Sequence, residues 1–217
     1  MKTNNQKYFY IVLIKALTGL GKFSRFFTKY EYTHIAVSFN DLYDDFISFS
    51  RKRHYSPFDA GFMHEHREHY AFGNNETFQI KVFRLKVSQE ETGKIKEYLS
   101  EIEQDGNYIF NLYSMLTMPV FHGFRIYKAF NCMSFTSKLL TMTSEVKLTK
   151  PYYKYSIKDI DLLLKNHLYF EGELKKEKQE DAEYMKRGIV FSNIFYFLKL
   201  NMLLIYRILF KRKKGNE

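Results

Sequence analysis

Cysteine, proline and glycine are all scarce in this chain: its 217 residues include one cysteine, three prolines and ten glycines. A single cysteine excludes a framework of internal disulfides, and it excludes zinc sites built from several cysteines. The simplest expected location is therefore a reducing cytoplasm. The few prolines and glycines argue against several modules joined by linkers, and they predict one domain with an appendage.

The sequence also lacks the patterns that assign several functions directly. No secretory signal is expected, because Lys15 ends the apolar run at residues 8–14 and no small-residue cleavage site follows it. The sequence has no glycine-rich phosphate loop, zinc-finger spacing or recognition-helix pattern. Binding to nucleic acid is therefore not expected, although the many tyrosines and the basic balance would permit stacking on single strands.

Aromatic residues and positive charge are abundant. Hydrophobic residues make up 45% of the chain and aromatic residues 18%, which is enough for a packed core. The formal charge of +10 favours an anionic partner, either a phospholipid surface or nucleic acid. Residues 211–214 carry four of the positive charges, so part of this excess belongs to a C-terminal tail.

The spacing of apolar residues predicts a mixture of strands and helices. Strands are expected at about residues 8–14, 33–39, 45–50, 77–85 and 168–172. Helices are expected after Gly21, at about 88–102 and 132–140, after Ser156 and over the charged residues 173–187. Residues 108–116 are expected as a helix or an irregular segment broken at Pro119, and the polar residues 51–75 as a loop or flap. These elements divide the chain into a domain at 1–172 and an extension at 173–217.

Residues 189–210 form a mostly apolar stretch of a length that suits a membrane-spanning helix. Lys199 near its centre makes spanning unfavourable by about 2.5–3.5 kcal/mol. Ser192, Lys199 and Tyr206 recur every seven residues and share one face, which favours a helix lying in the headgroup plane. The basic residues that follow favour anionic lipid by ~1 kcal/mol per charge. A helix that packs on the domain or forms a dimer is the second interpretation, and a true span is the third.

Cys132 is the main candidate for reactive chemistry, because it stands at the predicted start of a helix. The positive end of the helix dipole and the unpaired backbone N–H groups there favour the thiolate. His34 lies in a short alternating strand, and its imidazole can accept the thiol proton. The alternative is that Cys132 is an unreactive, buried hydrophobic residue, as lone cysteines commonly are.

The hairpin that contains His34 predicts a hydroxyl beside the imidazole. If its turn centres on Leu42, His34 faces Ser50, and a register tighter by two residues places Ser48 there instead. Either serine would orient the base, although less strongly than the carboxylate or amide usual in catalytic triads. The two serines are equally consistent with a simple polar face of the strand.

Three segments, at residues 32–38, 46–52 and 130–135, together resemble the circularly permuted NlpC/P60 proteins. These papain-like enzymes include the YiiX/YaeF-type bacterial proteins and, more distantly, lecithin:retinol acyltransferase. The histidine precedes the cysteine here, as in the permuted branch, and the resemblance spans roughly Tyr8 to Gly172. It implies an α+β papain-like fold: a small antiparallel sheet or half-barrel packed against the cysteine helix, with a C-terminal helical extension here.

The resemblance also implies a chemistry. Cys132 would be the nucleophile and His34 the general base, and the third polar residue of the family would fall near Ser48 or Ser50. Attack on an acyl carbon would give a thioester, resolved by water in a hydrolase or by another nucleophile in an acyltransferase, without a cofactor. The absence of an export signal argues against cell-wall peptides. An acylated lipid or peptide-like substrate is expected, on the inner face of a membrane.

Two further interpretations remain open from the sequence. His64, His66 and His69 have spacings from which a zinc site could be built, although no acidic partner is fixed by spacing and no metal is expected. A non-catalytic papain-like binding module is the other possibility, because the third polar residue is weak. The sequence does not determine the oligomeric state.

Overall fold

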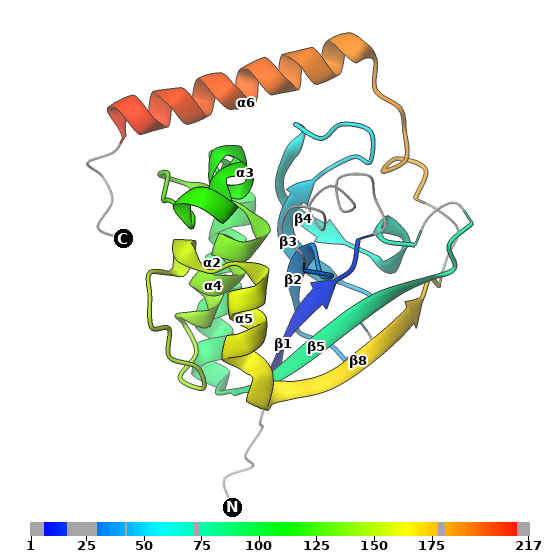
Figure 1. Cartoon of the computed structure of the whole chain (residues 1–217), viewed down its shortest axis with the longest axis vertical. Helices are drawn as coiled ribbons and strands as arrows, with labels where there is room; N and C mark the ends of the chain where they lie inside the picture. The colour runs from blue at the N-terminus through cyan, green and yellow to red at the C-terminus, as the bar shows by residue number, and fades with distance from the viewer. Residues whose placement is uncertain (1–6, 17–29, 42, 72–73, 178–180, 212–217) are drawn as a thin grey trace, which may run out of the picture.

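A six-stranded antiparallel sheet forms the centre of the molecule, with strand order β4-β3-β2-β1-β5-β8. The computed structural model describes residues 7–16, 30–41, 43–71, 74–177 and 181–211 (Figure 1). The helix expected after Gly21 and the basic residues 212–214 lie outside these ranges. The strands are β1 Lys7–Ile14, β2 His34–Ser38, β3 Phe46–Arg51, β4 Ala60–Glu65, β5 Thr77–Val87 and β8 Leu168–Lys175. The chain is therefore an α+β protein, as expected.

Strand β1 is the hydrophobic centre of the sheet. It pairs with β2 on one side and with β5 on the other, so its backbone groups are satisfied on both edges. Every residue from Phe9 to Ile14 is buried, because apolar side chains cover both faces of the sheet here. This explains why its sequence is a continuous apolar run instead of an alternating one.

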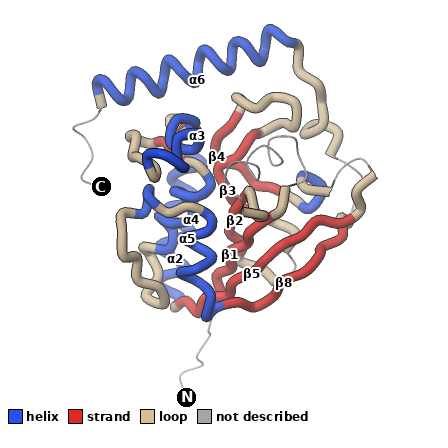
Figure 2. The backbone as a smooth tube through the Cα atoms, viewed as in Figure 1, coloured by secondary structure: helices blue, strands red, loops and turns tan. Residues whose placement is uncertain are grey.

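Helices gather on one face of the sheet, as Figure 2 shows. They are α2 Gln89–Gln104, α4 Cys132–Leu140 and α5 Ile157–Leu164. Ile95, Phe135 and Ile160 come from these three helices and pack with Phe9 and Leu85 in the larger hydrophobic core. A second, smaller core on the other side contains Tyr10, Phe46, Tyr70, Phe78 and Val82. The helix bearing the cysteine thus packs on the sheet.

Two helices start from one small strand pair. The strands β6 Ile109–Phe110 and β7 Ala129–Phe130 run parallel, and the backbone N–H of Asn111 extends the pairing by donating to the carbonyl of Phe130 at 2.8 Å. Helix α3, Leu112–Phe121, follows β6, and α4 follows β7. The pair therefore holds the first turns of α3 and α4 close together.

Three segments differ from expectation. Helix α3 continues through Pro119, because the proline lies in its last turn and removes only one backbone hydrogen bond before the helix ends. The polar residues 51–75 contain the edge strand β4 and a short 3-10 helix, Arg67–His69. The charged helix expected at 173–187 is wrong in its described part: β8 continues to Lys175, and residues 176–177 and 181–189 form no helix. The domain boundary expected after residue 172 therefore falls inside a strand.

Helix α6, Val190–Phe210, lies across one end of the molecule, over α3 (Figure 1). Leu200 and Leu204 are buried against the domain. Arg207 is also buried, and its guanidinium donates to the carbonyls of Tyr127 at 3.0 Å, Lys128 at 2.8 Å and Asn107. Among the described residues, α6 is the one helix long and apolar enough to cross a membrane by length and composition.

Truncation of Phe135 tests how α4 is held on the sheet. Its ring is fully buried and lies 5.1 Å from the ring of Phe49, measured between centroids. Phe135→Ala should lower the free energy of unfolding by about 3–5 kcal/mol, because it removes buried area and leaves a cavity. Urea denaturation measures this change. Leu162→Ala on the exposed side of α5 is the control and should change it by less than about 0.5 kcal/mol.

Candidate active site

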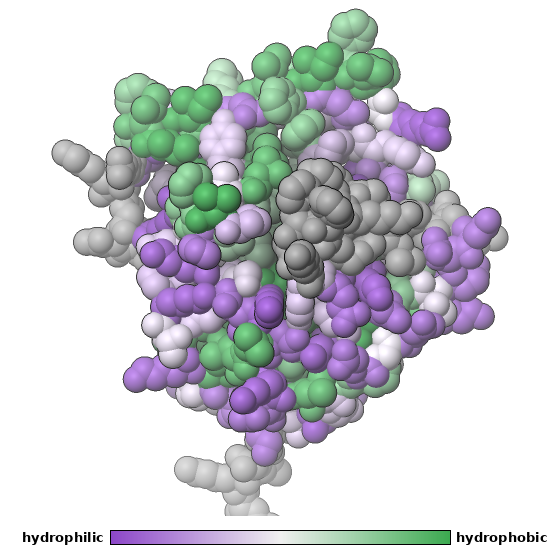
Figure 3. All heavy atoms as spheres, in the orientation of Figure 1, coloured by the Kyte–Doolittle hydropathy of each residue, from purple (hydrophilic) through white to green (hydrophobic). Residues whose placement is uncertain are grey.

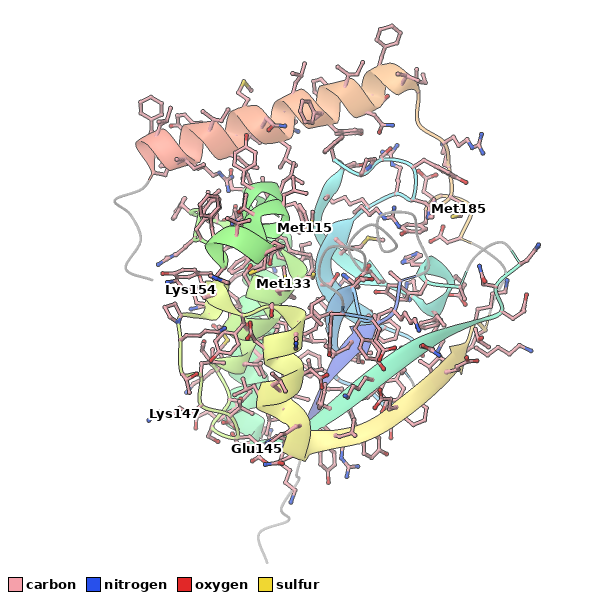
Figure 4. The ribbon with its side chains drawn as sticks, viewed as in Figure 1. Met115, Met133, Glu145, Lys147, Lys154 and Met185 are labelled. Carbon is pink, nitrogen blue, oxygen red and sulfur yellow. The ribbon has the colours of Figure 1, made fainter. Side chains whose placement is uncertain are left out.

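The start of α4 presents Cys132 as its first helical residue. Asn131 caps the helix: its side-chain oxygen accepts from the N–H of Ser134 at 2.9 Å, and the Ser134 hydroxyl accepts from the N–H of Asn131 at 3.1 Å. This capping box leaves the N–H groups of Cys132 and Met133 without a partner inside the helix. Figure 4 shows Met133 at the end of α4 nearest α3. The sulfur therefore lies at the positive end of the helix.

His34, the first residue of β2, lies beside this helix start. Helix α4 packs against β2 and β3, which brings together two residues 98 positions apart in the sequence. The thiol of Cys132 lies close enough to the imidazole of His34 to help raise the pKa of that imidazole. The structure thus brings the predicted nucleophile and general base together.

Glu65, the last residue of β4, is the third group of the site. One oxygen of its carboxylate, Oε2, lies 2.9 Å from Nε2 of His34, and the residue is only 3% exposed. Because Nε2 is engaged by the carboxylate, Nδ1 is the imidazole nitrogen left to face the thiol. Cys132, His34 and Glu65 therefore have the arrangement of nucleophile, base and orienting carboxylate.

Ser48 and Ser50 do not take the third position expected for them. Val37 pairs with Ile47, which is the register that aligns His34 with Ser50. Both hydroxyls nevertheless donate to the carboxylate of Glu65: Ser48 to Oε2, and Ser50 to Oε1 at 2.8 Å. The serines thus hold the carboxylate, and the carboxylate holds the imidazole.

Glu65 is not expected from the sequence, because it lies in a polar segment with four histidines for which the sequence predicts a loop. A signal was present in residues 60–65, where Phe62 and His64 alternate with Met63 and Glu65. Pairing with β3 places Glu65 on the side of Ser48 and Ser50. Glu65 pairs with Phe46, nineteen residues earlier in the chain, and an alternation over only six residues is too short to predict that pairing.

The buried charges of His34 and Glu65 stabilise one another. Burial by itself would lower the pKa of His34, but the charge of Glu65 and hydrogen bonds to Cys132 and Glu65 raise it to about 10. Burial would likewise raise the pKa of Glu65, but the charge and hydrogen bond of His34, with those of the two serines, lower it to about 2. The imidazole of His34 is therefore held in its positive form beside the sulfur of Cys132 at neutral pH.

Tyr70 forms an aromatic wall against this pair. Its ring centroid lies 5.8 Å from that of His34, and the ring also contacts Phe46 and Phe78. Burial, followed by the charge of Glu65, raises the pKa of Tyr70 well above its usual value. The phenol therefore stays neutral and shields the ion pair from water.

The other histidines considered for zinc do not converge. Nδ1 of His64 lies 2.9 Å from a carboxylate oxygen of Asp45, and Nε2 of His69 lies 3.1 Å from a carboxylate oxygen of Asp181. Nδ1 of His66 donates to the backbone carbonyl of residue 44 at 2.8 Å. Within the part of the chain that the structure describes, no three histidine, cysteine or acidic side chains form a group that could hold a metal ion.

Comparison with known proteins gives no match: no family model, curated protein or solved structure is similar to this chain.

The two shifted pKa values predict how stability depends on pH. The pKa of His34 is raised from 6.5, so its contribution is complete below pH 6.5 and is lost as the pH rises toward 10. The pKa of Glu65 is lowered from 4.5, so its contribution is present above pH 4.5 and is lost as the pH falls toward 2. The stability advantage of the wild type over Glu65→Gln should therefore be greatest between pH 4.5 and 6.5.

Urea denaturation of the wild type and of Glu65→Gln, from acid to alkaline pH, measures the difference in their unfolding free energies. A difference in unfolding free energy that stays constant from acid to alkaline pH would contradict the buried ion pair. Asp45→Asn is the matched control, because it removes a carboxylate from an exposed histidine pair. The advantage of the wild type over Asp45→Asn should be much smaller throughout.

Proposed function

We propose that this protein is a cysteine-dependent acyl hydrolase or acyltransferase of the circularly permuted NlpC/P60 type. The observation that carries the proposal is the convergence of Cys132, His34 and Glu65, which come from α4, β2 and β4. A carboxylate and an imidazole are both held in a buried position beside a thiol at a helix start. This combination is what nucleophilic cysteine catalysis requires.

The first half of the reaction forms a thioester. The proton of the Cys132 thiol passes to His34, and the thiolate attacks the acyl carbon of an ester or amide. His34 then returns this proton to the leaving alcohol or amine as its bond to the acyl carbon breaks. Glu65 keeps the imidazole oriented and stabilises its positive form throughout.

The second half releases the acyl group. His34 takes a proton from water, or from an acceptor alcohol or amine, whose oxygen or nitrogen attacks the thioester carbon. The carbon–sulfur bond breaks, and the thiolate of Cys132 is restored with its imidazolium partner. Water gives a hydrolase and another nucleophile gives an acyltransferase.

The oxyanion of each tetrahedral intermediate needs hydrogen-bond donors. The backbone N–H groups of Cys132 and Met133 supply two, because the capping box does not use them. A third is the side-chain nitrogen of Asn131, which is buried and has no hydrogen-bond partner among the residues that the structure describes. A buried amide nitrogen without an acceptor is costly, and an acyl oxygen bound at the helix start would satisfy it.

The substrate class follows from the chemistry and from the surroundings of the site. A thioester mechanism requires an acyl ester or amide, so the proposed substrate is an acylated lipid or peptide-like molecule. The ring of Tyr70, which lies beside His34 and packs against Phe46, gives this site an apolar wall, which suits an acyl chain.

Alkylation and turnover test the role of His34. Iodoacetamide should modify the folded wild type at neutral pH, and His34→Ala should react more slowly because it lacks the imidazolium beside the sulfur. Hydrolysis of an activated acyl ester should fall by about 10²–10⁴-fold in His34→Ala. Mass spectrometry follows the alkylation, and absorbance follows the hydrolysis.

His66→Ala is the matched control, because it removes a nearby histidine whose imidazole donates to the backbone carbonyl of Asp44. Wild-type protein that stays folded and unmodified at Cys132 would overturn the proposed function.

Replacement of Asn131 tests the oxyanion site. Serine caps a helix about as well as asparagine, so Asn131→Ser should preserve α4 while removing the unpaired amide nitrogen. The turnover number should fall by about a hundred- to a thousandfold, the usual effect of losing one oxyanion donor. Iodoacetamide alkylation should be almost unchanged, because that reaction forms no oxyanion. Unchanged turnover in a folded Asn131→Ser protein would exclude Asn131 as a donor.

A further inference from the structure

The outward face of α6 is entirely apolar. Leu200, Leu204 and Arg207 face the domain and are buried. On the opposite side of the helix, at about 100° per residue, the exposed residues are Phe191 at 80%, Leu198 at 59%, Met202 at 65% and Leu209 at 66%. Figure 3 shows hydrophobic residues gathered along this helix. A soluble surface helix has the reverse pattern, with its apolar side toward the core.

Polar contacts hold the inward side of α6 along its whole length. Near its start, the side-chain nitrogen of Asn193 donates to the carbonyl of Tyr55 at 3.1 Å. In its middle, the hydroxyl of Tyr113 donates to the side-chain oxygen of Asn201 at 2.7 Å. Near its end, Arg207 bonds to three backbone carbonyls. The helix therefore lies flat on the domain with its apolar side facing outward.

Helix α3 extends this apolar surface. It lies next to α6 through the contact between Tyr113 and Asn201. We define the apolar platform as the exposed apolar residues of the two helices: Leu116, Val120, Phe121, Val190, Phe191, Ile194, Phe195, Phe197, Leu198, Met202, Ile205, Leu209 and Phe210. Contiguous exposed apolar surfaces of this kind are uncommon on soluble monomers and mark sites of interaction.

The charges around the platform are positive. Apart from Arg207, which is buried against the domain, residues 186–211 carry the charges of Lys186, Arg187, Lys199 and Lys211 and contain no acidic residue. Lys199 is exposed on the flank of the helix, where its ammonium can reach the headgroups while its stem lies along the apolar surface. Figure 4 shows Glu145 and Lys147 at the end of the molecule opposite α6. Apolar area bordered by cations is complementary to an anionic lipid surface.

We infer that the platform binds the surface of an anionic lipid bilayer, with α6 lying in the headgroup plane. Contacts at the start, middle and end of α6 hold the helix against the domain. A helix that crossed the bilayer would have to break these contacts. The inference does not depend on the thiol chemistry. It adds to the proposed function a location where acylated lipids are concentrated.

Vesicle flotation tests the binding. The full chain should float with vesicles of phosphatidylcholine and phosphatidylserine, and less with phosphatidylcholine alone or in high salt. Leu198→Asp should reduce the partition coefficient by about ten- to a hundredfold, because the burial of one leucine is lost and a negative charge is added. Leu162→Asp is the matched control, because Leu162 is 61% exposed on α5, away from the platform.

Cys132→Ala should float like the wild type, so a failure of the catalytic proposal is distinguishable from a failure of this one. Absence of flotation with anionic vesicles, or equal flotation of Leu198→Asp and the wild type, would overturn the inference. A dimer in sedimentation that Leu198→Asp dissociates, without flotation, would assign the platform to a second copy and would also overturn it.

Depth measurements distinguish an in-plane helix from a spanning one. The chain has no tryptophan, so Phe191→Trp, Met202→Trp and Leu209→Trp each report one position on the outward face. Positions 191 and 209 are about 27 Å apart along a helix, close to the ~30 Å thickness of the hydrocarbon core. Quenching by lipids brominated at different depths should place all three at one shallow level. A deep position 202 between two shallow ends would show a span and overturn the in-plane arrangement.

Discussion

Removing a carboxylate and an imidazolium from water costs several kcal/mol for each ion unless each finds partners. Glu65 meets this requirement with hydrogen bonds from His34, Ser48 and Ser50, and His34 meets it with Glu65 and the neighbouring thiol. Three strands, β2, β3 and β4, must therefore align in one register before the pair is stable. The same alignment delivers the imidazole to Cys132, so folding of this corner of the sheet and assembly of the site are one event.

The small parallel pair β6 and β7 connects the candidate active site with the apolar platform. Helix α4, which begins with Cys132, and helix α3, which contributes to the apolar platform, both start from this pair. Arg207 of α6 bonds to the carbonyls of Tyr127 and Lys128, directly before β7. A bilayer against the platform would thus lie at the end of the molecule where α4 starts, which suits an enzyme for acylated lipids.

Much of the fold was predictable from local patterns. The apolar run of β1, the capping box at Ser88, the strand of His34 and the helix start at Cys132 all depend on neighbours within a few residues. The pairing of Val37 with Ile47 is one of the two registers that the sequence left open for this hairpin. The continuation of β8 to Lys175 was not expected, because it depends on pairing with Thr77, almost one hundred residues earlier.

The sequence by itself determined the residue types for the chemistry: one cysteine at a helix start, one histidine on a strand, and an apolar C-terminal helix with basic neighbours. Only the tertiary structure decided that Glu65, and not Ser48 or Ser50, holds His34, and that α6 turns its apolar side away from the domain. The physical reason is the same in both cases. Distant segments supply the hydrogen-bond partners, such as Glu65 for His34 and the Tyr127 carbonyl for Arg207. Local sequence patterns do not indicate such partners.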